Sequence, residues 1–242
     1  MAIVRDLTGD SRYYAALGQR AREQYTHDYA VAYRKSDELG VIEKWETHVD
    51  LEDFVAAVGE SFARPIDVLD LGCGSGRYFH CFSNLKSLTG VDISQDMLIQ
   101  AQRPVCAERI KVSVTLLCAN ISEIQFPPES FDFIYAIGVV GRFMPVDAHF
   151  LERTAKMLRP GGKLTFSASI AKLQAITWKR RIGLFMMPVL PKPIARPVQT
   201  RMRPFAVTEE KLRALLKASP FTHADVMKRE EGTEFLVVAE KS

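Results

Sequence analysis

From residue 65 to the end of the chain, strand-like and helix-like patterns alternate. Short apolar runs predict strands, and apolar residues at helical spacing predict the helices between them. The expected strands are 66–71, a run that ends at Ile93, 112–118, 131–138, 163–170, 224–228 and 235–239; the expected helices are 78–85, one capped by Ser94, 148–158, and one capped by Thr208 that continues to Leu216. Strands that are apolar on both faces and alternate with helices indicate a mostly parallel sheet covered on both sides. The predicted fold class is therefore α/β, with seven strands.

The first 64 residues are expected to form helices that cap this sheet. Tyr25, Tyr29 and Tyr33 stand at i, i+4 and i+8 and mark one helical face, and an apolar pattern from Leu51 to Gly59 indicates a second helix. A row of this kind usually packs in a core, but it could also belong to a lid over a ligand. The predicted organisation is a helical cap over 1–64 and a ligand-binding domain over 65–242.

A basic insert is expected between the fifth strand and the next helix, over 171–207, because this stretch is too long for an ordinary connection. It contains eight Lys and Arg, five Pro, and no Asp or Glu, whereas the whole chain has 32 Lys and Arg against 29 Asp and Glu. The eight cations are Lys172, Lys179, Arg180, Arg181, Lys192, Arg196, Arg201 and Arg203. Four interpretations remain open: a lid that faces an anionic substrate, a membrane-surface segment that inserts Trp178 and apolar neighbours, an RNA-binding patch, or a solvated loop.

Composition and cysteine usage indicate an ordinary globular protein. Hydrophobic residues make up 47% and charged residues 25% of the chain, which excludes disordered and collagen-like classes. The four cysteines (Cys73, Cys81, Cys106 and Cys118) form no C-x-x-C pair, so neither a metal site nor a disulfide framework is predicted. The sequence shows no signal peptide and no run of about 18 apolar residues, so we expect a cytoplasmic location.

A glycine-rich loop follows the strand at 66–71. Gly72, Gly74 and Gly76 stand at alternate positions, and glycines in such a loop permit a tight turn and close approach of a ligand to the backbone. Parallel sheets bind their ligands at this end of the strands. A dinucleotide fingerprint would require glycine where Arg77 stands, which argues against an NAD-dependent dehydrogenase.

An acidic residue ends the next strand. Asp92 lies 20 residues after Gly72, where a carboxylate can accept hydrogen bonds from both hydroxyls of a ribose. The alternative is an acidic residue that only stabilises the helix start at Ser94. The spacing from the glycine loop favours the ribose.

With these motifs the chain resembles the class I S-adenosylmethionine-dependent methyltransferases. The glycine motif of that family, D-x-G-x-G-x-G, matches the stretch that starts at Asp70, and its acidic strand end matches Asp92. A later family stretch matches loosely from Ala119 to Asp132, and the L-R-P-G-G turn matches 158–162. The resemblance covers 65 to about 170 and implies a Rossmann-like seven-stranded sheet with S-adenosylmethionine as cofactor and no metal.

The resemblance also implies which residues bind the cofactor. Asp70 and the loop would hold the methionine part, Asp92 the ribose, and Asn120 the adenine, with Asn120 standing where the family often has Asp. The full implied set is Asp70, Gly72, Cys73, Gly74, Gly76, Asp92, Ile93, Met97, Asn120, Ile121 and Ala136.

The expected activity is methyl transfer to a small-molecule acceptor, which can be anionic. Alignment of the acceptor and exclusion of water account for such a transfer, and none of the five histidines stands at a position that singles it out as a base. Tyr14, Arg142 and Trp178 are the candidate substrate residues, Arg142 because a guanidinium can bind a carboxylate or phosphate. The alternatives are a tRNA methyltransferase, an enzyme for a membrane-associated lipid or quinone, and a non-catalytic cofactor-binding subunit.

Overall fold

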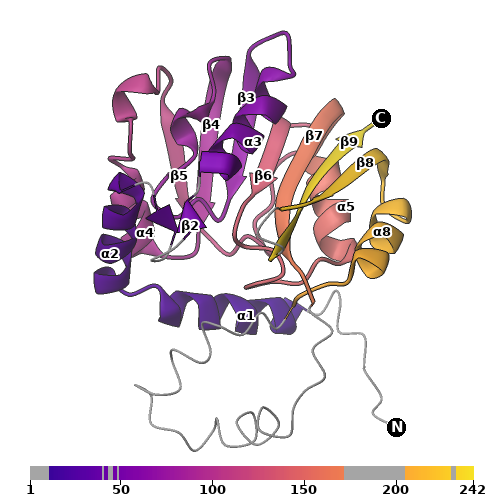
Figure 1. Cartoon of the computed structure of the whole chain (residues 1–242), viewed down its shortest axis with the longest axis horizontal. Helices are drawn as coiled ribbons and strands as arrows, with labels where there is room; N and C mark the ends of the chain where they lie inside the picture. The colour runs from indigo at the N-terminus through magenta and orange to yellow at the C-terminus, as the bar shows by residue number, and fades with distance from the viewer. Residues whose placement is uncertain (1–10, 40, 43–45, 48, 172–204, 230–232) are drawn as a thin grey trace, which may run out of the picture.

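The computed structural model describes residues 11–39, 41–42, 46–47, 49–171, 205–229 and 233–242 (Figure 1). Trp178 and all eight cations of the predicted insert lie outside the described residues. The interpretations of that insert therefore stay predictions, and so does the division of the chain at residue 64.

The described chain is built on one seven-stranded sheet. In spatial order the strands are β5 (Val114–Cys118), β4 (Leu85–Asp92), β3 (Ile66–Leu71), β6 (Phe131–Ala136), β7 (Leu158–Ser169), β9 (Glu234–Lys241) and β8 (Phe221–Lys228). The first five strands of this spatial order, from β5 across to β7, pair in parallel. β9 is antiparallel to both of its neighbours, β7 and β8. The predicted mostly parallel, seven-stranded α/β fold is confirmed.

The strand order reverses beside β3. From β3 the chain proceeds outward to β4 and β5, and then returns to pair β6 on the other side of β3. In open α/β sheets this reversal opens a crevice at the carboxyl ends of the strands. The glycine loop after β3 and Asp92 at the end of β4 both face that crevice.

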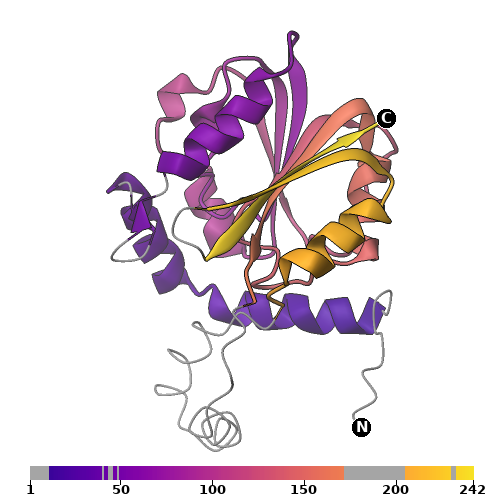
Figure 2. The ribbon, with the colours of Figure 1, turned by 45° about the vertical axis from the view of Figure 1, so that its right-hand side comes forward.

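Helices cover both faces of the sheet (Figure 2). α3 (Val49–Glu60) packs with Val68 and Phe133 in one apolar cluster, together with residues of α4 (Gln95–Ala101). α5 (Ala148–Met157) and α8 (Glu209–Lys217) pack with Leu69 and Ile134 in a second cluster. Because neighbouring residues of a strand point to opposite faces, β3 and β6 each contribute to both clusters.

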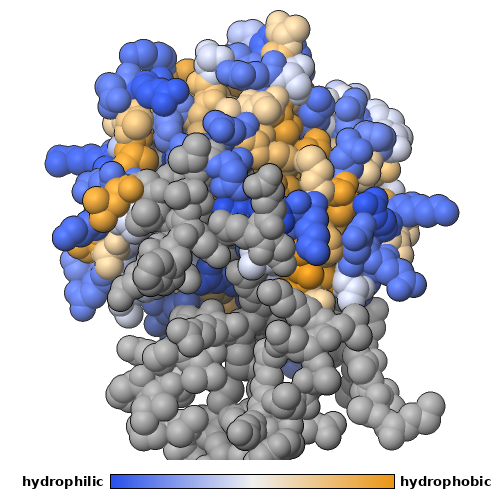
Figure 3. Space-filling view, viewed as in Figure 1, coloured by the Kyte–Doolittle hydropathy of each residue, from blue (hydrophilic) through white to orange (hydrophobic). Residues whose placement is uncertain are grey.

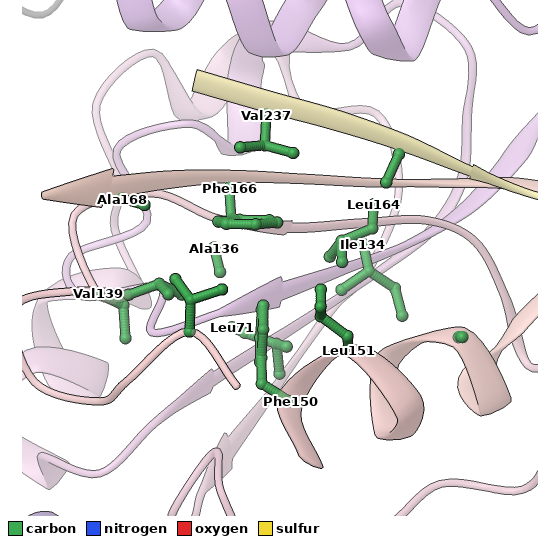
Figure 4. Close-up of a cluster of buried hydrophobic side chains, with 14 of the residues drawn as sticks. Leu71, Ile134, Ala136, Val139, Phe150, Leu151, Leu164, Phe166, Ala168 and Val237 are labelled. Carbon is green, nitrogen blue, oxygen red and sulfur yellow. The ribbon is translucent and has the colours of Figure 1, made fainter. Parts of the chain in front are cut away.

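The second cluster shows how α5 is held against the sheet. Phe150 and Leu151 of α5 point toward Leu71 and Ile134 of the strands (Figure 4), and both helix residues are at most 2% exposed. α5 begins at Asp147, whose side chain accepts a hydrogen bond from Phe150 N. The predicted caps of two other helices are confirmed: Ser94 accepts from Met97 N and Thr208 accepts from Lys211 N.

Two elements differ from the sequence-based expectation. The helix predicted over 78–85 is wrong: a short 3₁₀ turn, Phe79–Cys81, follows the glycine loop, and β4 already begins at Leu85. Phe79 and Phe82 are buried in the apolar cluster that contains α3. The chain packs both rings there without forming an α-helix. β7 begins earlier than predicted, because the L-R-P-G-G turn is part of the strand.

Two N-terminal helices precede the sheet. α1 (Ser11–Gln24) lies across the carboxyl ends of the parallel strands, and α2 (His27–Glu38) turns away from it beside α4 (Figure 1). The helix break at Tyr25 and Thr26 interrupts the face predicted for the tyrosine row. A small hairpin of β1 (Val41–Ile42) and β2 (Glu46–Thr47) follows.

The surface of the face seen in Figure 1 is mixed. Figure 3 shows apolar side chains gathered near the middle of this face, with hydrophilic side chains around them. Among the described helices, none combines the length and the apolar character that a membrane crossing requires.

Candidate functional site

A cavity of about 690 Å³ lies at the carboxyl ends of the central strands, beneath α1 and α2. Its walls come from the glycine loop, from the end of β4, from the loops after β5 and β6, and from the two N-terminal helices. Its volume falls in the range of about 300–1,000 Å³ that is usual for small-molecule sites. Residues far apart in the sequence therefore share one site.

The glycine loop forms the floor of this cavity. All three loop glycines have positive φ angles, and Gly72 has φ +83°. A Cβ atom at Gly72 would lie 2.3 Å from Cγ2 of Val139, so any side chain there would collide with the loop after β6. The requirement for glycine at this position follows from both the backbone conformation and the close approach.

Asp92 presents a pre-oriented carboxylate to the cavity. Its Oδ2 accepts a hydrogen bond from Gly74 N and its Oδ1 from Ser94 N, both at 2.9 Å. Burial raises the pKa of the Asp92 carboxyl, and these backbone hydrogen bonds oppose that effect. Each carboxylate oxygen has a further lone pair, so the side chain can still accept hydroxyl donors from a ligand in the cavity.

Asp70 lies behind the loop and is 2% exposed. Among the described residues no donor stands in good hydrogen-bonding geometry to its Oδ2, although the nearby Tyr135 hydroxyl interacts with the carboxyl and partly offsets the effect of burial on its pKa. Burial raises the pKa of Asp70 well above its usual value. A buried acceptor without a donor is costly, so this oxygen suits a donor that comes with a ligand or water.

Asn120 connects the cavity to α1. Its Oδ1 accepts from Ser122 N at 3.0 Å, and its Nδ2 donates to the carbonyl oxygen of Tyr14 at 3.1 Å. An aspartate, which the resemblance described above would lead one to expect here, is an acceptor only when ionised and could not donate to that carbonyl. The amide of Asn120 therefore gives the strand ends a direct hydrogen bond to the cap.

α1 approaches the strand ends closely because it carries Gly18. A Cβ atom at Gly18 would lie 2.6 Å from Nδ2 of Asn120 and 2.8 Å from Cδ1 of Ile93. Distances this short do not occur for real side chains, so Gly18 sets the distance at which α1 covers the site. Ile93, Met97 and Ile121 complete the cavity wall beneath it.

The tyrosine row lines the cavity. The ring centroids of Tyr25 and Tyr29 are 5.1 Å apart, those of Tyr29 and Tyr33 are 6.0 Å apart, and Phe143 lies 5.5 Å from Tyr25. Burial raises the pKa of Tyr33 to about 12 and that of Tyr25 well above its usual value. The row is thus a neutral aromatic wall at physiological pH, and its interpretation as part of a lid stays a prediction.

A buried ion pair joins the cap to the glycine loop. Arg77 Nε donates to Asp37 Oδ1 at 2.6 Å, and the hydroxyl of Ser75 donates to Asp37 Oδ2. Asp37 and Ser75 were not among the site residues predicted from the sequence. A signal was present, however, because Asp37 follows Tyr33 by four residues and so continues the tyrosine row on the same helical face.

Two further arginines line the cavity. Arg142 is partly buried, and its guanidinium lies 5.4 Å from the ring centroid of Phe143. Arg229, which the sequence analysis missed, is 6% exposed and binds both carboxylate oxygens of Asp50, at 2.5 and 2.8 Å. Its backbone N donates to the carbonyl oxygen of Glu234, so this corner of the site is held between α3 and the β8–β9 connection.

Most of the predicted cofactor residues meet in the cavity. Those that line it are Gly72, Cys73, Gly74, Asp92, Ile93, Met97, Asn120 and Ile121. Asp70, Gly76 and Ala136 do not line it. The side chain of Ala136 points to the α5 face and is fully buried there, and Ile137 and Gly138 form the wall instead.

The three predicted substrate residues do not meet. Arg142 lines the cavity, Trp178 lies outside the described residues, and Tyr14 points elsewhere. The Tyr14 hydroxyl donates to Asp147 Oδ2 at 2.5 Å, and its ring stacks on His149 at 4.9 Å. Tyr14 therefore anchors α1 to the start of α5.

The cavity wall contains no histidine in the part of the chain that the structure describes. The same part holds no cluster of three or more His, Cys, Asp or Glu that could bind a metal ion. The polar side chains that line the cavity include the tyrosines, three arginines, Asp92, Asn120, Glu234, Ser36 and Ser122.

Comparison with known proteins identifies related sequences. Residues 68–162 match the family model of the methyltransferase domain. The ubiquinone biosynthesis O-methyltransferase of Bradyrhizobium diazoefficiens is 36% identical over 101 residues, which cover 41% of this chain and 38% of that protein. The phosphatidylethanolamine N-methyltransferase of Cereibacter sphaeroides is 28% identical over 110 residues, 46% of this chain and 54% of that protein. The chain matches less than two thirds of the length of either relative.

Solved structures with the same fold cover nearly the whole chain. Magnesium protoporphyrin IX methyltransferase from Synechocystis, with bound SAH, has a TM-score of 0.64 at 16% identity, over 93% of this chain and 100% of that one. Phosphoethanolamine N-methyltransferase 2 from Haemonchus contortus, in complex with S-adenosyl-L-methionine, has a TM-score of 0.66 at 16% identity, over 91% and 58%. At these identities the comparison shows a shared fold.

Proposed function

Because residues 68–162 match the family model of the methyltransferase domain, we propose that this chain transfers a methyl group from S-adenosylmethionine to a small aromatic acceptor. The observation that carries the proposal is the composition of one cavity, in which the glycine loop and Asp92 face a wall of tyrosines. One side of the cavity suits a nucleoside with a polar tail, and the other suits a flat apolar ring.

The residues present fit the cofactor. Asp92 would accept the ribose hydroxyls, Met97 and Ile121 would contact the adenine, and the backbone at Gly72 and Gly74 would hold the methionine part. The Oδ2 of Asp70, which lies behind the loop, would accept from the methionine ammonium group through a bridging water. When bound, S-adenosylmethionine supplies a methyl group on a positively charged sulfur, which an acceptor atom takes by displacement.

The chain contributes alignment and exclusion of water rather than a strong base. α1 covers the strand ends, and Tyr25, Tyr29 and Phe143 close the cavity with apolar ring surface. Holding two reactants in contact geometry accounts for about 7–11 kcal/mol of a barrier in favourable cases. The neutral tyrosine hydroxyls can orient an acceptor oxygen by hydrogen bonding, and an acidic phenol-type hydroxyl would need no dedicated base.

The aromatic wall supports the choice of acceptor. Aromatic side chains bind flat rings by offset or edge-to-face contacts with centroids about 4.5–7 Å apart, the spacing that the row already shows. Arg142 on the same wall can donate to a carboxylate or hydroxyl of such a ring. Of the two curated relatives, the one named for ubiquinone biosynthesis is an O-methyltransferase, and the wall favours a ring hydroxyl over an ethanolamine amine as acceptor.

Binding of S-adenosylhomocysteine measured by calorimetry tests the cofactor site. Asp92→Ala removes the acceptor of the ribose hydroxyls and should weaken binding by about tenfold or more, as expected for loss of hydrogen bonds to a charged group. Asp96→Ala is the matched control, because Asp96 lies on α4, pairs with His27 at 3.4 Å and does not line the cavity. The cofactor site would be refuted if the wild-type protein did not bind S-adenosylhomocysteine. It would also be refuted if both variants lost affinity for this ligand by the same factor.

A turnover screen with labelled S-adenosylmethionine tests the acceptor. The panel contains ring hydroxyl compounds with and without a carboxylate, ethanolamine phospholipid in vesicles, and tRNA. Label transfer to the ring hydroxyl compounds is expected. Label transfer only to the phospholipid, or only to tRNA, would show that the proposed acceptor is wrong and would favour the corresponding alternative. Binding of S-adenosylmethionine without label transfer to any compound would favour a non-catalytic subunit.

A further inference from the structure

We propose that Asp37 of α2 is a positioning residue for the cofactor loop: through Arg77 and Ser75 it holds the second half of the glycine loop, so that cofactor binding and docking of the cap are energetically coupled. This inference rests on the proposed cofactor site and adds a means of regulating it. Asp37 does not line the cavity, so any effect that it has on the cofactor must act through the loop residues that it holds or through the neighbouring cavity residues of α2.

The contacts of Asp37 use both of its carboxylate oxygens. Arg77 Nε lies 2.6 Å and Arg77 Nη2 lies 2.5 Å from Oδ1, and the Ser75 hydroxyl donates to Oδ2. Asp37 and Arg77 are each 4% exposed, and Ser75 is 1% exposed. The Arg77 guanidinium also lies over the ring of Tyr33, 4.6 Å from its centroid. α2 thus holds the loop through charge, hydrogen bonding and ring contact at one buried place.

The two halves of the glycine loop are anchored differently. The first half is fixed to β4, because Gly72 N and Cys73 N donate to the carbonyl oxygen of Val91, and Gly74 N donates to Asp92. The second half, at Ser75 to Arg77, is not followed by an α-helix, since only the 3₁₀ turn Phe79–Cys81 comes after it. In its place, the side chains of this half are bound by a helix that lies about forty residues earlier in the chain.

The strength of the coupling follows from burial. If α2 leaves, the Arg77 guanidinium loses both its carboxylate and the ring of Tyr33, and Ser75 loses its hydrogen-bond acceptor. The second half of the loop then loses the buried side-chain contacts with α2 that hold it beside Gly74. By thermodynamic linkage, a ligand that binds the ordered loop must then also favour the docked cap, to the same extent.

The test uses the full chain and S-adenosylhomocysteine. Asp37→Asn is expected to weaken S-adenosylhomocysteine binding, measured by calorimetry, by about tenfold, because it removes the charge from the buried contact. Glu38→Gln is the matched control: Glu38 is the next residue of α2 and pairs with Arg34 at 3.2 Å, but its side chain is 59% exposed. The control should bind within about twofold of wild type, as is usual for exposed pairs.

A second measurement separates coupling from simple damage. Hydrogen exchange of the α2 amides should slow when S-adenosylhomocysteine binds the wild-type protein, and this ligand-induced protection should be lost in Asp37→Asn. Ser75→Ala gives a milder variant that removes one hydrogen bond and should bind about threefold more weakly with an unchanged circular dichroism spectrum. This variant keeps the inference testable if Asp37→Asn does not fold.

The outcomes are distinguishable. If folded Asp37→Asn and Ser75→Ala bind S-adenosylhomocysteine with wild-type affinity, the inference is overturned and the proposed function still stands. The same holds if ligand binding leaves the exchange of α2 in the wild-type protein unaltered. Wild-type protein that binds no S-adenosylhomocysteine would refute the proposed function and this inference together.

Discussion

Asp132 joins three segments at the end of the sheet that lies opposite the cavity. Its Oδ1 accepts from Arg64 Nη2 at 2.7 Å, and its Oδ2 accepts from Asp67 N and from Arg159 Nη1, both at 2.8 Å. The residue belongs to the family-like stretch that ends at Asp132, for which the sequence analysis assigned no role. The structure shows a structural role, since this carboxylate ties the starts of β3, β6 and β7 together.

The charge of Asp132 should make the stability of the protein depend on pH. Burial raises its pKa, but hydrogen bonds from Arg64, Asp67 N and Arg159 outweigh burial and hold it below the usual value. A carboxyl with a lowered pKa in the folded state stabilises the protein above the unfolded pKa of about 4, and this contribution is lost as the pH falls through the folded pKa. Asp132→Asn should therefore lower the free energy of unfolding by about 2 kcal/mol at pH 7, and by less at pH 3.

Urea denaturation of wild type and Asp132→Asn at the two pH values provides the measurement. Glu129→Gln is the control, because Glu129 pairs with Lys241 at 3.7 Å with a side chain that is 56% exposed. If Asp132→Asn lowers the free energy of unfolding by the same amount at pH 7 and at pH 3, the charge of the carboxylate does not account for its stabilising role.

At the scale of elements, the sequence predicted those helices and strands that are determined by local hydrophobic pattern and capping residues. The strands at 66–71 and 131–138 and the helices capped by Ser94 and Thr208 follow from apolar runs and capping residues, and all appear in the structure. The helix over 78–85 was wrong because Phe79 and Phe82 look periodic but pack separately into the α3 cluster. Such packing depends on residues distant in sequence, which local patterns do not report.

α1 offers a test of an element whose placement depends on one residue. Gly18→Ala should raise the intrinsic helix propensity of α1 by about 1 kcal/mol. We expect it nevertheless to lower the melting temperature and to weaken S-adenosylhomocysteine binding severalfold, because the added Cβ would lie 2.6 Å from Nδ2 of Asn120. Gln19→Ala, on the exposed side of the same helix, should change neither quantity. A Gly18→Ala protein that is more stable and binds as tightly would show that the close approach of α1 is not required.

At the scale of the whole molecule, the site was predictable only in part. The glycine loop and Asp92 could be placed because their spacing and their position at strand ends follow from the chain order. The contacts of Asp37 with Ser75 and Arg77, and of Asn120 with α1, could not, because they join the cap to strands that are distant in sequence. The cap and the sheet thus specify the cavity jointly, although each was predicted separately.

The two apolar clusters should unfold as one unit, because they share the strands of a single sheet. Phe133 and Ile134 are adjacent in β6 and fully buried, yet Phe133 belongs to the α3 cluster and Ile134 to the α5 cluster. Phe133→Ala should lower the free energy of unfolding by about 3–5 kcal/mol and Ile134→Ala by about 2–5 kcal/mol. Urea denaturation gives these values, and hydrogen exchange at the amides of α3 and α5 tests the coupling: each variant should reduce protection in both helices by a similar factor. If Phe133→Ala reduced protection in α3 while α5 kept its wild-type exchange rates, the two faces of the sheet would be independent folding units.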